Sequence, residues 1–310
     1  MSRKIIVGSR KSKLALTQTN WVIQELKKKR PELEFQIYEI ITKGDKILDV
    51  TLNKVGGKGL FVSEVETALQ TGEIDFAVHS MKDVPAQLAA ELTIGAIPKR
   101  ESPFDCLVFD QVDHWDQLPS GAIIGTSSLR RAAQLQRLRP DFQIRSIRGN
   151  IDTRLKKLHE EAFDAIVLAE AGLARMGWLN HAKLKWASLP AEICLPAVGQ
   201  GALAVECRET DLEIRQLLAS IHDVETAFTV RAERAFLKRL DGGCEIPLAG
   251  FAEKHDTQVR LRGMVAEPES GTFYRTIKIG SDPEQVGVLA AEELLASGAE
   301  KVIRELKQND

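Results

Sequence analysis

Arginine is concentrated in one short stretch of this 310-residue chain. Between positions 130 and 154 stand seven arginines and only two acidic residues, Asp141 and Asp152, so the local charge is strongly positive. A guanidinium can donate to two oxygens of one carboxylate or phosphate, which suits such a cluster to binding an anion. A solvated helix face is the alternative explanation. The seven are Arg130, Arg131, Arg137, Arg139, Arg145, Arg148 and Arg154.

Basic residues stand at three expected strand ends. At the second of these ends, hydroxyls lie between an expected strand at 122–125 and an expected helix at 129–138, so they and the first helical amides face the same place as the arginines that follow. This arrangement binds anions, and three of them predict a polyanionic ligand between two domains. The three segments are Arg10-Lys11-Ser12, Thr126-Ser127-Ser128-Leu129-Arg130-Arg131 and Arg148-Gly149-Asn150.

An isolated acid, Asp83, follows an expected strand at 74–78 in the run His79-Ser80-Met81-Lys82-Asp83. In open α/β sheets, ligands bind at the carboxyl ends of the strands. Among many cations the carboxylate stays ionised, which suits it to stabilising a cationic intermediate. A turn or capping aspartate is the alternative.

Cys244 differs from the other three cysteines because it follows Gly242-Gly243. Two glycines leave space for a large group to approach the sulfur, so a tethered cofactor and a covalent intermediate are both open. Cys106, Cys194 and Cys207 are expected to be small buried hydrophobes. No C-x-x-C pair and no closely spaced histidines occur, so no metal site is expected.

Composition excludes several classes of protein. A net charge of −2 and 5% aromatic residues do not favour nucleic acid as a partner. Gly199-Gln200-Gly201 resembles a dinucleotide fingerprint, but it precedes a strand-like run and opens no helix, and no P-loop occurs. No stretch approaches the ~20 apolar residues of a membrane span, so we expect no membrane association and a cytoplasmic protein with reduced thiols.

Strand-like and helix-like segments alternate along most of the chain, which predicts two doubly wound α/β domains followed by a smaller α+β domain. A glycine-bearing stretch at 42–59 is expected to be a long binding loop. The final helix is expected to be single. The predicted domains are 1–100 with 197–222, then 101–196 with the basic cleft, and 223–310 with Cys244.

In sequence order, these motifs resemble those of the porphobilinogen deaminase (hydroxymethylbilane synthase) family over essentially the whole chain. The segments that carry the resemblance are Val7-Gly8-Ser9-Arg10, Thr42-Lys43-Gly44-Asp45, Gly56-Gly57-Lys58-Gly59-Leu60-Phe61, Ala77-Val78-His79-Ser80-Met81-Lys82-Asp83, Gly125-Thr126-Ser127-Ser128-Leu129-Arg130-Arg131, Arg148-Gly149-Asn150, Leu195-Pro196-Ala197-Val198-Gly199-Gln200-Gly201, Glu233-Arg234-Ala235-Phe236 and Gly242-Gly243-Cys244-Glu245-Ile246-Pro247.

The resemblance implies a fold and an activity. The first two domains would be like type II periplasmic binding proteins, and the chain would be a monomer. Cys244 would hold a dipyrromethane cofactor through a thioether. Four porphobilinogen molecules would be joined head to tail on it with release of ammonia, and hydrolysis would then free hydroxymethylbilane for heme and other tetrapyrroles.

The resemblance also implies roles for individual residues. Asp83 and Lys82 would be catalytic, with Asp83 stabilising positive charge on pyrrole nitrogens. The cofactor would be held by Cys244, Ser80, Lys82, Asp83, Thr126, Ser127, Ser128, Arg130 and Arg131. The substrate porphobilinogen would be bound by Arg10, Ser12, Gln18, Lys58, Arg148, Arg154 and Arg175.

One segment departs from the family pattern. Where that pattern reads R-E-D-P-R-D-A, this chain has Ser102, Phe104 and Cys106 at the third, fifth and seventh positions. The departure is expected to affect contacts between domains and to leave the site residues unaffected. The competing interpretation of the whole chain is a non-catalytic receptor for a small anion, which would consume no porphobilinogen; a cysteine hydrolase using Cys244 has little support because no motif places a histidine near it.

Overall fold

The structure is a computed structural model that describes residues 4–42, 62–181, 184–243, 246–268 and 270–308. Lys58, Cys244 and almost all of the predicted loop at 42–59 lie outside these ranges. Expectations about them therefore stay predictions.

The first sheet has five strands in the order β2-β1-β3-β10-β4. β1, β2 and β3 run parallel, whereas β10 is antiparallel to both of its neighbours. Val7, Phe76 and Val205 are fully buried at its centre, as expected of strands covered on both faces. The strands are β1 (Ile5–Arg10), β2 (Phe35–Ile40), β3 (Phe76–Ser80), β4 (Leu92–Ala96) and β10 (Leu203–Arg208), and the helices beside them are α1 (Lys13–Lys29), α3 (Ser63–Gln70) and α7 (Leu212–Ala219).

The second sheet repeats this pattern in the order β7-β6-β8-β5-β9. β6, β7 and β8 run parallel, and β5 is antiparallel to both of its neighbours, β8 and the edge strand β9. Every residue of β5 is buried. The strands are β5 (Asp105–Phe109), β6 (Ile123–Gly125), β7 (Gln143–Arg145), β8 (Ala165–Ala169) and β9 (Lys185–Leu189), and the helices are η3 (Trp115–Gln117), α4 (Leu129–Leu138), α5 (Ile151–Glu160) and α6 (Glu170–Arg175).

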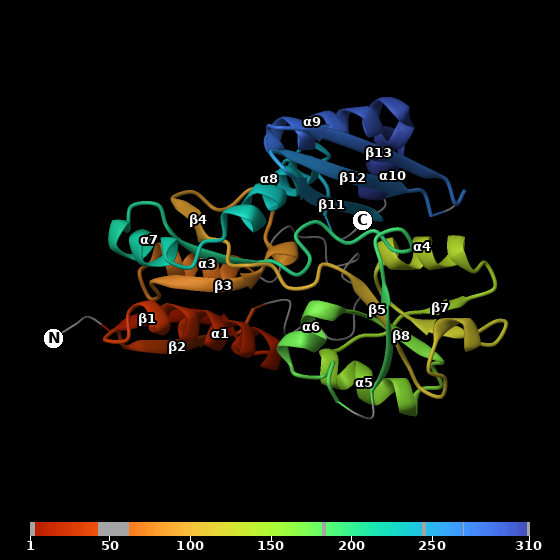
Figure 1. Cartoon of the computed structure of the whole chain (residues 1–310), viewed down its shortest axis with the longest axis horizontal. Coiled ribbons are helices and arrows are strands. Elements are labelled where there is room, and N and C mark those ends of the chain that lie inside the picture. The colour runs from red at the N-terminus through yellow and green to blue at the C-terminus, as the bar shows by residue number, and fades with distance from the viewer. Residues whose placement is uncertain (1–3, 43–61, 182–183, 244–245, 269, 309–310) are drawn as a thin grey trace.

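The chain crosses between the two sheets twice, at 97–104 and at 190–202, and the two domains lie side by side (Figure 1). Gly201 marks how closely these crossings approach. Its φ is +86°, and a Cβ there would lie 2.4 Å from the carbonyl oxygen of Glu101 and 2.5 Å from that of Ser102. Only glycine fits a left-handed backbone against two carbonyls.

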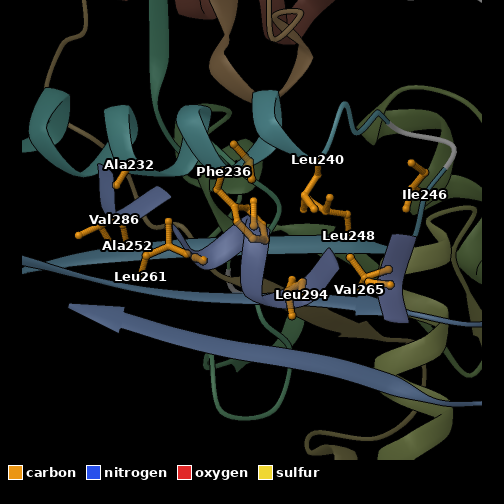
Figure 2. Packing of buried hydrophobic residues seen from close by; sticks show 14 of the residues in the cluster. Ala232, Phe236, Leu240, Ile246, Leu248, Ala252, Leu261, Val265, Val286 and Leu294 are labelled. Carbon is orange, nitrogen blue, oxygen red and sulfur yellow. The ribbon is translucent and has the colours of Figure 1, made fainter. Parts of the chain in front are cut away.

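A smaller C-terminal domain packs two helices on a three-stranded antiparallel sheet, β11-β12-β13. Phe236 points from α8 toward this sheet (Figure 2). Its ring lies over Gly250 and Gly263, which face each other across β11 and β12, because a Cβ at either glycine would come within 3 Å of it. The elements are α8 (Val224–Arg239), β11 (Leu248–His255), β12 (Gln258–Ala266), β13 (Phe273–Gly280), α9 (Pro283–Leu294), a π-helical turn η4 (Leu295–Ala299) and α10 (Glu300–Gln308).

The fold class agrees with the expectation of two α/β domains and a smaller α+β domain. The expected single final helix is wrong, because Gly298 has a φ of +114° and separates α9 from α10. Four strands were not predicted: β4, β5, β9 and β11. Within the described ranges, no helix combines the length and apolar character needed to cross a membrane.

Replacing Gly201 by alanine is expected to lower the free energy of unfolding by about 3 kcal/mol or more, because the new methyl group meets two carbonyl oxygens and the backbone is left-handed. Gly177→Ala is the matched control, since Gly177 also has a positive φ (+71°) but a Cβ there would meet nothing within 4 Å. It should cost about 1 kcal/mol. Urea unfolding of both variants measures the difference, and equal losses would contradict the close approach at Gly201.

Candidate active site

Lys82 and Asp83 lie on a single 3₁₀ turn, η2 (Met81–Asp83), directly after β3. The turn is fixed at its start, because the Met81 amide donates to the Ala202 carbonyl at 3.0 Å. Gly199 packs on the same methionine, where a Cβ would come within 2.5 Å of its side chain. Asp83 is exposed on a well-supported turn, as a group that meets a ligand should be.

A cavity of about 60 Å³ opens beside Asp83. Gln18, which is buried on α1, donates from Nε2 to the Ser80 hydroxyl at 3.1 Å across this cavity wall. Ser12 caps α1 by accepting from the Ala15 amide. The structure therefore brings together five of the predicted site residues: Arg10, Ser12, Gln18, Ser80 and Asp83.

Lys82 points toward the second domain. Its Nζ lies 3.5 Å from Gln200 Oε1, and Gln200 Nε2 donates to Asp105 Oδ1 at 2.9 Å. Burial lowers the pKa of Lys82; Asp83 opposes this shift and Arg131 adds to it. Gln200, fully buried, thus links the turn η2 to Asp105, the first residue of β5 in the second sheet.

Arg130 and Arg131 both bind Asp105, which is completely buried. Arg130 donates from NH1 to Asp105 Oδ2 at 2.7 Å, and Arg131 donates from NH2 to Oδ1 at 2.6 Å. Burial alone would raise the pKa of Asp105, but the two guanidinium groups outweigh it and hold that pKa well below its usual range. The count of two acids against seven arginines therefore overstated the free positive charge, since Asp105 neutralises part of it.

Arg148 and Arg154 form the less compensated part of the cluster. In the part of the chain that the structure describes, neither is in an ion pair; Arg154 donates from Nε to the Gly149 carbonyl at 2.9 Å. Burial, together with repulsion from Arg131 and Arg148, lowers the pKa of Arg154 to about 10. The two cations repel each other, and among the described residues no carboxylate lies close enough to form an ion pair with either.

The hydroxyl segment before α4 has mostly structural partners. Ser127 accepts from the Ile147 amide at 3.1 Å and donates to its carbonyl at 2.8 Å, which joins the segment after β6 to the segment after β7. Ser128 caps α4, and Thr126 accepts from the Ser128 amide. Arg175 lies apart from them and donates to the Gly201 carbonyl at 2.7 Å; burial lowers its pKa to about 10.

Sequence reasoning missed two buried residues of the site, Asp105 and Gln200. Asp105 lies in the segment that departs from the family pattern, and Gln200 lies in the segment that resembles a dinucleotide fingerprint. The signal that could have pointed to Asp105 is that a buried pair of arginines requires a carboxylate. Phe104, one of the three residues that differ from the family pattern, packs edge-on against Phe251 of the C-terminal domain, with ring centroids 6.0 Å apart. This contact joins the segment to the C-terminal domain; the expected effect of the departure on contacts between the first two domains stays a prediction.

The described cysteines are not candidate nucleophiles. Cys106, Cys194 and Cys207 are buried and free. Burial raises the pKa of Cys194 to about 12 and that of Cys207 to about 11, which keeps both as thiols. Among the described residues, no three histidine, cysteine, aspartate or glutamate side chains gather as metal ligands would.

Comparison with known proteins identifies the family. The family model "Porphobilinogen deaminase, dipyromethane cofactor binding domain" matches residues 5–216, and "Porphobilinogen deaminase, C-terminal domain" matches residues 227–296. The chain belongs to the porphobilinogen deaminase family. Porphobilinogen deaminase of Listeria welshimeri is 64% identical over 307 residues, 99% of each chain, and that of Geobacillus kaustophilus is 56% identical over 306 residues, 99% of this chain and 98% of the relative.

Solved structures that match this chain include a periplasmic domain of Bordetella pertussis BvgS and the methionine binding protein MetQ. The first has a TM-score of 0.40 at 15% identity and covers 75% of this chain and 91% of its own. The second has a TM-score of 0.43 at 14% identity and covers 72% of this chain and 92% of its own. Membership of the porphobilinogen deaminase family makes the chain a transferase of tetrapyrrole biosynthesis that uses a dipyrromethane cofactor.

Replacing Asp105 by asparagine is expected to cost about 3–5 kcal/mol of unfolding free energy, because two guanidinium groups stay buried without their carboxylate. Asp141→Asn is the control: it removes an exposed pair with Arg139 and should cost less than about 1 kcal/mol. Both are measured by urea unfolding at neutral pH. A loss as small as that of the control would contradict the buried pairing.

Lowering the pH should reduce the difference in unfolding free energy between the wild type and Asp105→Asn. A carboxyl group whose folded pKa is lowered stabilises the fold fully above its unfolded pKa, and this stabilisation fades as the pH falls toward the folded pKa. The wild type should therefore lose stability below about pH 4, where an unfolded aspartate takes up its proton, whereas the variant has no such group to titrate. Unfolding curves from pH 7 down to pH 3 test the sign; a gap that widens in acid would refute it.

Proposed function

We propose that the cleft between the first two domains performs the reaction of the porphobilinogen deaminase family with the residues assigned below. Four porphobilinogen molecules are joined head to tail, ammonia is released at each addition, and water finally frees hydroxymethylbilane. The observation that carries this assignment is the pair Arg148 and Arg154, cations that are close together, partly buried and short of anions.

The described residues fit a dipyrromethane, which carries acetate and propionate groups. A ligand with several carboxylates would balance Arg148 and Arg154 and restore the ordinary pKa of Arg154. Cys244 would hold the cofactor through a thioether. When bound, the dipyrromethane supplies the nucleophilic pyrrole carbon to which porphobilinogen units are added.

Different parts of the cleft would bind different carboxylates. Arg10 and Ser12 lie at the cavity beside Asp83, so we assign them, with Gln18, to the incoming porphobilinogen. Arg148 and Arg154 bind the carboxylates of the growing chain, and Arg175 and Lys58 also bind substrate. Thr126, Ser127, Ser128, Arg130 and Arg131 form the cofactor side of the cleft, where the Asp105 pair limits the free charge of the two arginines.

Asp83 performs the electrostatic part of the chemistry. Loss of ammonia from porphobilinogen leaves a positively charged pyrrole, and the Asp83 carboxylate accepts a hydrogen bond from its N–H. The same carboxylate oxygen can take the proton that the attacking pyrrole α-carbon loses after the new carbon–carbon bond to the porphobilinogen CH2 has formed. Lys82 and Ser80 together bind a carboxylate of the cofactor beside Asp83. Gln200 orients the Lys82 ammonium.

The domains support this chemistry as three units: 1–100 with 197–222, 101–196, and 223–310. In support of the discontinuous first unit, β10 pairs with β3 and β4 within the first sheet. We further propose that the loop at 42–59 closes over the substrate, that the chain acts as a cytoplasmic monomer, and that it has no nucleic-acid partner.

The intact mass of the purified protein tests the cofactor assignment. The wild type should carry a surplus equal to two deaminated pyrrole units, because a thioether survives denaturation, and Cys244→Ala should lack it. Cys207→Ala is the control and should keep the surplus. A wild type that has no surplus, and gains none with porphobilinogen, would favour the anion receptor.

Substitution of Asp83 tests the charge assignment. Asp83→Ala should lower kcat about 10²–10³-fold, because a preorganised partner of the developing cation is lost. Asp83→Glu keeps the charge but displaces it, so it should retain more activity than the alanine variant. Glu73→Ala, at an exposed position before β3, serves as the control with wild-type activity. Equal activity of the Ala and Glu variants would refute the role of Asp83.

A further inference from the structure

Arg234 reaches from the C-terminal domain to the chain segment that follows Asp83. It lies on α8, and its NH2 donates to the Pro85 carbonyl at 2.9 Å and to the Ala86 carbonyl at 3.4 Å. Its NH1 lies 3.4 Å from the Val84 carbonyl and 3.8 Å from Met81 Sδ. One guanidinium thus contacts both the first residue of the turn η2 and the segment that follows it.

These contacts satisfy carbonyl groups that the local backbone leaves open. Residues 84–91 form no helix or strand. Within the turn, the Val84 amide donates to the Met81 carbonyl at 3.2 Å. Carbonyls in such a segment need donors from elsewhere. Arginine presents several donors in one rigid plane, which a lysine ammonium cannot reproduce.

The partners of Arg234 are unusual for a charged side chain. Its hydrogen-bond partners among the described residues are carbonyl oxygens and a thioether sulfur. Burial lowers its pKa, and the more distant carboxylate of Glu206 opposes this shift. A cation that is partly buried without a carboxylate contact costs stability. This unfavourable placement of Arg234 is explained if the arginine holds residues 81–86 in a fixed position.

The neighbouring residue Glu233 fixes α8 against the other side of the turn. Its carboxylate accepts from the Gly199 amide at 2.6 Å and from the Ala252 amide at 2.9 Å, and it pairs with Arg100 at 2.7 Å. Gly199 in turn packs on Met81. The start of the turn and the segment after it are therefore both attached to one helix, which ends at Arg239, five residues before Cys244.

We propose that Arg234 is a positioning residue, which fixes the Asp83 carboxylate relative to the helix that leads to Cys244. The inference rests on the proposed roles of Asp83 and Cys244. Arg234 acts through the backbone of residues 81–86, so its loss should displace Asp83 without removing a contact to substrate. A displacement of about 1 Å at a reacting group costs about 10²-fold in rate.

Variants at Arg234 and at Arg231 provide a matched comparison on the same helix. Arg234→Met should lower kcat about 10²-fold and Arg234→Lys about tenfold, with KM changed less than about threefold, because a positioning contact acts on the transition state. Arg231 is half exposed and pairs with Glu284 at 3.5 Å, so Arg231→Met and Arg231→Lys should stay near wild-type activity. All variants should carry the cofactor mass.

Hydrogen exchange supplies a readout that does not depend on activity. In Arg234→Lys, amides in the peptide that spans 81–91 should exchange about tenfold faster than in the wild type, while the urea midpoint of the whole protein stays close to that of Arg231→Lys. Unchanged exchange in this peptide would overturn the proposal. Since Arg234→Lys keeps the charge and the stem, it serves the test even where Arg234→Met does not fold.

A double-mutant cycle with Asp83→Glu separates positioning from general stabilisation. If Arg234 acts by placing Asp83, Arg234→Lys should cost less than about twofold in a chain whose carboxylate is already displaced. Independent, multiplying losses would overturn the inference while leaving the role of Asp83 intact. Wild-type activity of Asp83→Ala would instead refute the proposed function on which the inference rests.

Discussion

A buried carboxylate between two buried guanidinium groups is the constraint on which the junction of the first two domains depends. Asp105 begins β5, the strand that joins the second sheet to the crossing from the first, and Arg130 and Arg131 come from α4. Neither partner could stay in place alone, because an unpaired charge in a dry interior is strongly unfavourable. Gln200 extends this pair toward Lys82, so the geometry of the first domain's turn depends on a charge balance made in the second domain.

The C-terminal domain contributes more than a place for a cysteine. Phe236, buried over two glycines, attaches α8 to its own sheet, whereas Glu233 and Arg234 on the same helix attach it to the crossing segment and to the turn after β3. About one turn of a single helix, residues 233–236, therefore connects the core of the third domain to the turn after β3 in the first domain. These contacts explain the motif Glu233-Arg234-Ala235-Phe236, one of the segments that carry the family resemblance.

Elements with strong local signals were predictable from the sequence. α4 agrees with the predicted bounds, 129–138, to the residue, since Ser128 caps the helix. β5 was not predictable, because it begins with a charged residue whose partners lie 25 and 26 positions away. The anion-binding strand ends were evident from arginine and hydroxyl spacing, but pairing with a distant acid leaves no local pattern. Long-range compensation of charge is visible only once the strands are paired.

The two sheets differ in one respect that bears on how the chain is made. All five strands of the second sheet fall between residues 105 and 189, so they are synthesised without interruption. The first sheet lacks its antiparallel strand β10 until residue 208, and β3 and β4 have no partner between them before then. On the ribosome, the second domain is thus the first that can be completed. The first domain must wait, with an open strand edge, for the chain to return to it.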